Sequence, residues 1–217
     1  MVQEYIISKK ELMNTSIIID DGHNTLGAIF AHLPARVVSH SYRVQNICSV
    51  LAGHVPKNLL PEGLNDKNYA AAVSRGAHYH EIGIYSARND VYNRPAAGSI
   101  LIKKYLQIEK TCAMSRVVFE TVKYHKQKYI FNDEVPLHAA ICNIACAFDM
   151  MTMPNGKYSE KRFKKAAEYI CNNSGKIFHP KAVKCFELAR DEVFGYYGGY
   201  DSGRDNISGG RVMLEVW

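Results

Sequence analysis

Apolar residues recur with the period of an α-helix through most of this chain. Between residues 36 and 54 they fall at Val37, Val44, Ile47, Val50 and Leu51, which places them on one face of a helix. The same pattern predicts further helices over residues 25–33, 66–82, 95–106, 115–128, 135–151, 159–173 and 180–195. Strand-like alternation is nearly absent, so we expect an all-α fold, a helical bundle.

Polar and proline residues mark where several of these helices begin. Asp66 is expected to cap the alanine-rich helix that follows it, and Ser159 opens the helix of residues 159–173. Pro95 and Pro180 suit the first turn of a helix, where a missing backbone N–H costs nothing.

Composition divides the chain into three parts. Residues 1–24 are predicted to be an N-terminal extension, residues 25–194 a helical domain, and residues 195–217 a glycine- and tyrosine-rich tail. The tail is too rich in glycine for a helix and ends on Trp217, the only tryptophan. It is either a flexible segment or a segment that docks a protein partner.

Charge and cysteine usage limit the class of protein. The net charge is +6, with basic clusters at residues 123–128 and 161–165, which fits either nucleotide or nucleic-acid binding or simply solvated helix faces. No apolar run reaches 18 residues, and the first residues do not resemble a signal peptide, so we expect no membrane partner. Six cysteines without a CxxC pair indicate reduced thiols and a cytoplasmic protein.

The doublet His80-Glu81 is the main candidate for chemistry. Adjacent residues lie about 100° apart on a helix, so both side chains can reach one ion only where the helix bends or ends, which Gly83 allows. His40 and His125 lie on other predicted helices. Three histidines and one acid are sufficient for a hydrolytic metal centre, although each histidine alone also fits a satisfied core residue.

Two residues of the helix at 135–151 could complete such a centre. Cys146 would suit zinc or iron as a thiolate, and Asp149 lies three residues further along the same face. Cys146 also fits a buried core thiol.

Several segments, in this order, resemble a known family. His40 with Arg43-Val44 and the run His80-Glu81-Ile82-Gly83 resemble the HD superfamily of metal-dependent phosphohydrolases. The later segments Val135-Pro136-Leu137, Ala145-Cys146-Ala147-Phe148-Asp149, Lys157-Tyr158 and Gly175-Lys176-Ile177-Phe178-His179-Pro180 are similar to its HD-GYP branch. The resemblance covers about residues 25–194 and rests on the order of the segments more than on any one of them.

The chain also departs from that family at positions that matter for metal binding. Glu81 replaces the aspartate of the doublet, Cys146 replaces another aspartate, and the GYP tripeptide is missing. Further departures are Arg36 for a glutamate, Ile84 for a lysine, Arg94-Pro95 for a His-Pro pair, and Tyr124-His125 for paired histidines. We therefore expect a reduced centre with one divalent ion: iron, manganese or zinc.

The resemblance implies a phosphohydrolase or phosphodiesterase that acts on a nucleotide or cyclic dinucleotide through a metal-activated water. It implies metal ligands among His40, His80, Glu81, His125, Cys146 and Asp149, catalytic roles for Glu81 and His125, and contacts of Arg94 and His125 with phosphate. The alternative is a catalytically inactive HD-like module that binds a nucleotide or a protein partner. A nucleic-acid-binding module is a third reading, based only on the net charge of +6 and on lysines interleaved with tyrosines. The oligomeric state stays open.

Overall fold

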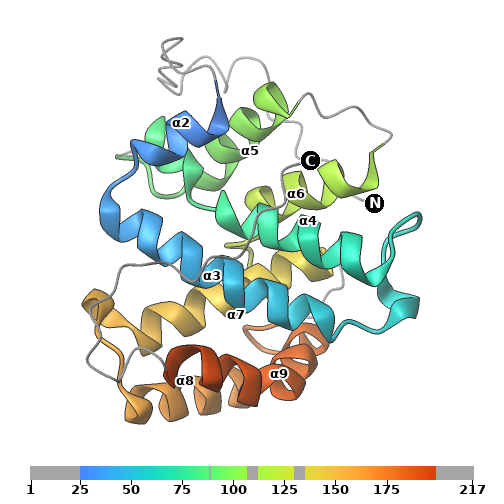
Figure 1. Cartoon of the computed structure of the whole chain (residues 1–217), viewed down its shortest axis with the longest axis vertical. Coiled ribbons are helices and arrows are strands. Elements are labelled where there is room, and N and C mark those ends of the chain that lie inside the picture. The colour runs from blue at the N-terminus through green and yellow to red at the C-terminus, as the bar shows by residue number, and fades with distance from the viewer. Residues whose placement is uncertain (1–24, 88, 107–111, 130–134, 199–217) are drawn as a thin grey trace.

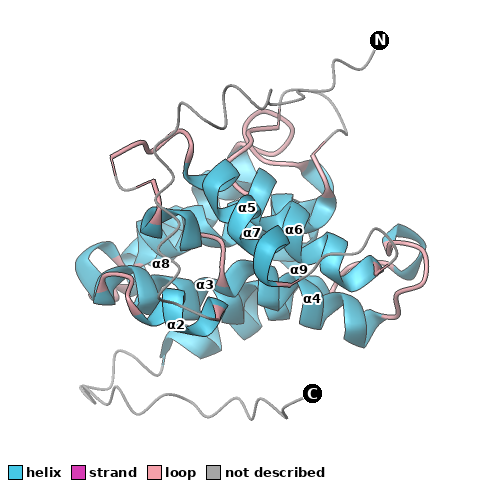
Figure 2. Cartoon of the chain, turned by 90° about the horizontal axis from the view of Figure 1, so that it is seen from above, coloured by secondary structure: helices cyan, strands magenta, loops and turns pink. Residues whose placement is uncertain are grey.

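The computed structural model describes residues 25–87, 89–106, 112–129 and 135–198. Within these ranges every regular element is a helix, apart from one isolated bridge between Ser174 and Phe178 (Figure 2). The expected all-α class is therefore confirmed for the described residues. Among these residues, none of the helices combines the length and the apolar character needed to cross a bilayer.

The helices follow the predicted order along the chain. The α-helices are α2 (Leu26–Ala31), α3 (Ala35–Gly53), α4 (Asp66–His78), α5 (Arg94–Tyr105), α6 (Ala113–Tyr124), α7 (Leu137–Thr152), α8 (Glu160–Asn172) and α9 (Pro180–Gly198). Three short 3₁₀ helices join them: η1 (Lys57–Leu59), η2 (Ile82–Tyr85) and η3 (Pro154–Gly156).

Helices α3 and α7 run through the middle of the molecule (Figure 1). Helix α3 packs against α4, α7 and α9, while α6 packs against α4, α5 and α7. Helices α8 and α9 pack against α7 and against each other, below α3 and α7 in the view of Figure 1. Burial of apolar surface in this arrangement supplies most of the stability of such a bundle.

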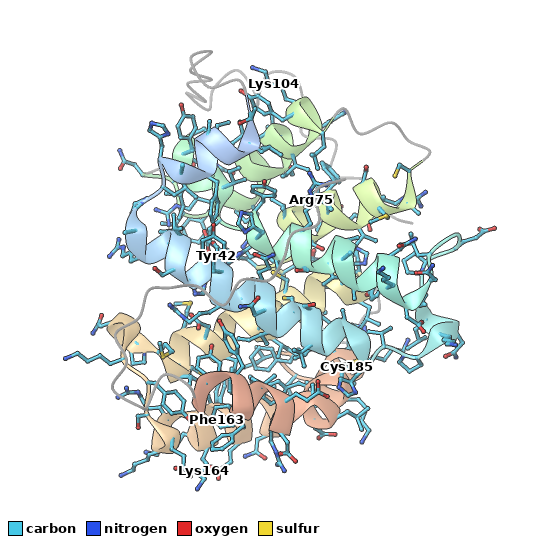
Figure 3. The ribbon with its side chains drawn as sticks, viewed as in Figure 1. Tyr42, Arg75, Lys104, Phe163, Lys164 and Cys185 are labelled. Carbon is cyan, nitrogen blue, oxygen red and sulfur yellow. The ribbon has the colours of Figure 1, made fainter. Side chains whose placement is uncertain are left out.

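Helix α8 carries the basic cluster of residues 161–165. Phe163 points into the core and contacts the ring of Phe148, whereas Lys164 points away from the core (Figure 3). Lys164 pairs with Glu160, four residues earlier, at 2.7 Å, and its side chain is 68% exposed. This lysine therefore lies on a solvated helix face.

The first and last residues of several elements differ from the predictions. Asn65, rather than Asp66, caps α4, because its side-chain oxygen accepts a hydrogen bond from the Asn68 amide at 2.8 Å. Helix α4 ends at His78 instead of near Ile82, and α6 ends at Tyr124 instead of Lys128.

Helix α9 continues through the start of the glycine-rich segment, where no helix is predicted. The reason is tertiary: Tyr197 is buried and donates a hydrogen bond to Asp149 at 2.6 Å, and Tyr196 accepts one from Asn46 at 2.9 Å. The proposed extension at residues 1–24 and the docking role of the tail from residue 199 onward lie outside the described residues.

Candidate metal centre

Four elements bring the predicted ligands together. His40 lies on α3, the doublet His80-Glu81 lies between α4 and η2, His125 follows the last residue of α6, and Cys146 lies on α7. Because α3 packs against α4 and α7, and α6 packs against α4 and α7, these side chains meet inside the bundle.

The doublet lies beyond the end of α4, although the sequence predicts that this helix continues to about Ile82. After His78 the chain forms a turn, in which the His80 amide bonds the Ala77 carbonyl at 3.4 Å, before η2 begins at Ile82. Gly83 is required here because a Cβ at this position would lie 1.9 Å from the Arg94 carbonyl oxygen. The backbone of α5 therefore packs directly on the segment that carries the doublet.

Each of the three imidazoles is held through its Nδ1 atom. His80 Nδ1 lies 2.7 Å from the Ala77 carbonyl oxygen, and His125 Nδ1 lies 2.9 Å from that of Val122. His40 Nδ1 lies 2.7 Å from Asp149 Oδ2. A hydrogen bond at Nδ1 places the proton on that atom and leaves Nε2 as a lone-pair donor, which is the usual arrangement of metal-bound histidine.

The Nε2 atoms of His40 and His80 face each other, and His40 Nε2 also lies close to a thiol. His40 Nε2 lies 3.3 Å from His80 Nε2 and 3.5 Å from Cys146 Sγ. Among the residues that the structure describes, two groups have all their ligand atoms within 4.8 Å of one another: His40 with His80 and Cys146, and His80 with Glu81 and His125. His80 belongs to both groups, so the two together form one cluster.

His125 provides the strongest sign that the cluster is a site. Its Nε2 atom is buried, and it has no hydrogen-bond partner among the described residues. The nearest carboxylate oxygen, Glu81 Oε1, is 4.0 Å away. An unpartnered buried polar atom costs about 1–3 kcal/mol, so a ligand that satisfies it is favoured.

Asp149 lies behind His40 and outside both ligand groups. Its two oxygens accept hydrogen bonds from His40, from Arg43 at 2.7 and 2.9 Å, and from Tyr197. The structure therefore gives this aspartate the position of a residue that orients a ligand. Sequence reasoning missed Tyr197, because the glycines around it do not suggest a buried residue.

Burial keeps two of the histidines neutral. Desolvation lowers the pKa of His80 to about 3, helped by the neighbouring His125, and it lowers the pKa of His125 to about 3, helped by Lys126. At neutral pH both imidazoles are uncharged, which is the form that binds a metal.

The acidic groups differ in how they respond to burial. Burial alone raises the pKa of Glu81, but His80 and Lys126 outweigh it and lower the pKa below its ordinary value. Since His80 is neutral at pH 7, Lys126 is the partner that holds Glu81 ionised there. Burial raises the pKa of the Cys146 thiol well above its usual range, so without a metal this thiol stays protonated.

Lys126 is a second residue that sequence reasoning missed. Its ammonium lies 3.0 Å from Glu81 Oε1 and 3.3 Å from Oε2. The only signal was the basic cluster at residues 123–128, which equally fits a solvated helix face.

The predicted phosphate contact Arg94 is the first residue of α5. Its Nε atom lies 3.4 Å from the Ala87 carbonyl oxygen, and its own carbonyl packs on Gly83. Its backbone is thus next to the segment that carries the doublet, while its side chain contacts the loop before α5 at Ala87.

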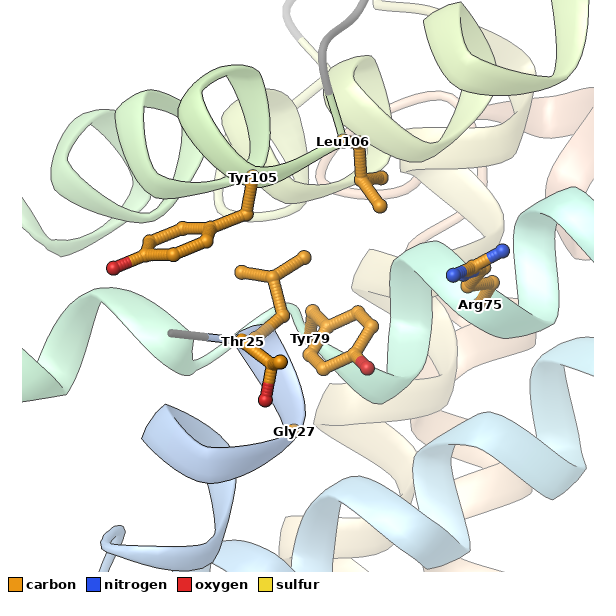
Figure 4. A pocket seen from close by; sticks show the side chains of 7 residues that line it. Thr25, Gly27, Arg75, Tyr79, Tyr105 and Leu106 are labelled. Atoms are coloured by element: carbon orange, nitrogen blue, oxygen red, sulfur yellow. The ribbon is translucent and has the colours of Figure 1, made fainter. Parts of the chain in front are cut away.

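A cavity of about 230 Å³ lies apart from the histidine cluster (Figure 4). It is lined by Thr25, Leu26, Gly27, Arg75, Tyr79, Tyr105 and Leu106. None of the predicted ligands lines it, so the cavity gives no support to the predicted site.

Comparison with known proteins identified no relatives: no protein-family model matches the chain, and no curated protein matches it.

Proposed function

We propose that the protein is a divergent HD-GYP-like phosphohydrolase that uses one divalent metal ion. The observation that carries the proposal is the shared orientation of His40, His80 and His125. Each Nδ1 is held by a carbonyl or a carboxylate, and the histidines belong to two ligand groups that share His80, one completed by Cys146 and the other by Glu81. A histidine that only fills a core has no need of this arrangement.

The donor set fits the proposed ion. Each ligand group offers two imidazoles and either the Cys146 thiol or the Glu81 carboxylate. Such donors favour zinc or iron over magnesium or calcium, which prefer oxygen ligands. The buried, unpartnered Nε2 of His125 is the atom that such an ion would satisfy.

The residues of the chain have distinct roles in this proposal. A bound divalent ion supplies a water of lowered pKa and polarises a phosphoryl oxygen. Asp149 and the carbonyls of Ala77 and Val122 keep the imidazoles oriented. Glu81, ionised at neutral pH, accepts a hydrogen bond or a proton from water at the cluster. The resemblance of the sequence suggests a nucleotide or cyclic dinucleotide as substrate.

Metal analysis of the purified protein tests the proposal. We expect about one zinc or iron per chain, lost in His80→Ala. His78→Ala is the matched control, since His78 lies two residues away, is half-buried, and belongs to neither ligand group. Turnover of a generic phosphoester by the metal-loaded protein, absent in His80→Ala, is the second expected result. Equal metal content in wild type and His80→Ala would reject the proposal.

A second candidate is a metal-free module that binds a nucleotide or a protein partner. The observation that favours it is the Lys126–Glu81 ion pair, which balances the carboxylate charge without any metal. A wild-type protein that takes up no zinc or iron on dialysis, yet folds normally, would support this candidate.

A further inference from the structure

The carboxylate of Asp149, on α7, is held by side chains from two other helices. His40 Nδ1 lies 2.7 Å from its Oδ2 atom, and Arg43 donates to both of its oxygens. Both of these residues lie on α3. The hydroxyl of Tyr197, on α9, donates to Oδ1 at 2.6 Å. Among the described residues, Tyr197 is therefore the only donor to this carboxylate that does not lie on α3.

The Tyr197 side chain is fixed by the packing of its ring. The residue is 0% exposed, and its ring stacks on that of Tyr158, with the centroids 5.7 Å apart and the planes inclined by 18°. Phe148 contacts the same ring in a T-shaped arrangement at 5.9 Å. Because the phenol oxygen lies in the plane of the ring, these contacts also fix its position against Asp149.

The hydroxyl of Tyr197 acts on Asp149 rather than on packing. A phenylalanine ring fills nearly the same space, and burial of a phenol hydroxyl is unfavourable unless the hydroxyl forms a hydrogen bond. A hydrogen bond to a carboxylate is among the stronger ones, because the acceptor carries a charge.

The contact from α9 restrains the carboxylate in a way that α3 alone does not. His40 and Arg43 lie three residues apart on one helix, so both move together with that helix. A carboxylate that is held only from α3 can turn with it. The hydrogen bond from Tyr197 fixes the orientation of Asp149 against a second helix.

This orientation reaches the ligand cluster through His40. Its ring is held at Nδ1 by Asp149, while Nε2 lies 3.3 Å from His80 Nε2 and 3.5 Å from Cys146 Sγ. The groups of a metal site must stay within about 0.5 Å and 10–20° of the binding geometry. A carboxylate that turns carries the His40 ring with it, and Nε2 then leaves the position in which it meets the other ligand atoms.

We propose that Tyr197 is a positioning residue of the candidate metal centre: through Asp149 it fixes the ring of His40, so that the last turn of α9 sets the affinity for the ion. This inference rests on the proposed function, because it assigns Tyr197 a role in binding the same metal.

Zinc affinity, measured by competition with a chromogenic chelator, tests the role of Tyr197. Tyr197→Phe keeps the ring and removes only the hydroxyl. We expect this variant to bind zinc about 3- to 10-fold more weakly, a smaller loss than the 10- to 100-fold typical of a residue that contacts a metal ligand directly.

Tyr196→Phe is the matched control. It removes a phenol hydroxyl from the adjacent residue, which accepts a hydrogen bond from Asn46 on α3 at 2.9 Å. This variant also weakens a contact between α9 and α3, but it leaves the donors of Asp149 in place. Its zinc affinity should equal that of the wild type.

The Asp149→Asn background shows whether Tyr197 acts through the carboxylate. In that background Tyr197→Phe should change zinc affinity by less than about twofold, because the charge that Tyr197 orients is gone. A residue that only supports the bundle would weaken zinc binding by the same factor in both backgrounds, since independent effects add.

The outcomes separate this inference from the proposed function. Equal zinc affinity in the wild type and Tyr197→Phe overturns the role of Tyr197 and leaves the metal centre standing. An equal loss in Tyr196→Phe, or an undiminished loss in the Asp149→Asn background, also overturns it, because the effect then comes from general packing of α9. A wild-type protein that takes up no zinc rejects the proposed function and this inference together.

Discussion

His40 and His138 each pair with a carboxylate, and these two pairs differ in what the second ring nitrogen does. His40 bonds Asp149 through Nδ1 at 2.7 Å and turns Nε2 toward His80 and Cys146. His138 bonds Glu120 through Nε2 at 2.9 Å, and it belongs to neither ligand group. Contact with a carboxylate therefore does not by itself mark a site; convergence of the remaining nitrogen with other donors does.

The carboxylates differ as well. Asp149 is 1% exposed and is compensated by Arg43 and Tyr197 in addition to His40. Glu120 is 27% exposed, so water also solvates its charge. The first pair is part of a buried network, where removing one partner is costly, and the second is a partly solvated contact.

The largest expected effect is the response of the cluster to acid. The pKa values of His80 and His125 are about 3, and that of His78, lowered by burial, is about 4. Below about pH 6.5 the unfolded chain binds these protons and the folded chain does not, so the free energy of unfolding falls as the pH drops. Each histidine contributes about 1.4 kcal/mol per pH unit, or about 2 kcal/mol at pH 5.

Urea denaturation of the metal-free protein at pH 7.5 and pH 5 measures this loss. The lowered pKa values of Glu81 and Asp149 act only below about pH 4.5, so they do not contribute in this window. In the double variant His80→Asn, His125→Asn, the loss of stability between pH 7.5 and pH 5 should shrink to the part that His78 contributes. Equal stability of the wild type at the two pH values would show that the histidines are not buried in their neutral form.

The next largest effect is expected from truncating the two carboxylates, which should destabilise the protein by different amounts. Asp149→Ala removes the buried carboxylate that accepts hydrogen bonds from Arg43 and His40, and it should lower the free energy of unfolding by about 3–5 kcal/mol. Glu120→Ala removes one partly solvated contact and should cost about 1 kcal/mol. Chemical denaturation at pH 7.5 measures both, and similar losses would contradict the distinction between a buried network and an isolated contact.

The smallest expected effect tests whether Asp149 supports metal binding through its hydrogen bond to His40. Asp149→Asn keeps the shape but removes the charge behind His40, and it should weaken zinc binding by about 10- to 100-fold. Glu120→Gln should leave zinc affinity unchanged. Competition with a chromogenic chelator gives both affinities, and circular dichroism confirms that each variant is folded. A parallel loss in Glu120→Gln would mean that the effect is transmitted by general destabilisation.

Local pattern was sufficient for most of the fold. The helical period of apolar residues predicts α3 and α7 to within two residues at each end, whereas the helix predicted to end near Ile82 ends at His78, before the doublet. Helix ends were less accurate where tertiary contacts decide them. Tyr197 extends α9 because its ring is buried and its hydroxyl bonds Asp149, which no local pattern of glycine and tyrosine reveals.

The sequence alone determined the helical class of the described residues and the identity of the histidines and acids that could bind a metal, because residue type and period are local properties. Only the tertiary structure decided which of these atoms meet. It brings His40, His80, His125, Glu81 and Cys146 together, places Asp149 behind them, and adds Lys126 at the solvent side. These relations join side chains as far as 109 residues apart, so they depend on how the helices pack rather than on the residues beside each one.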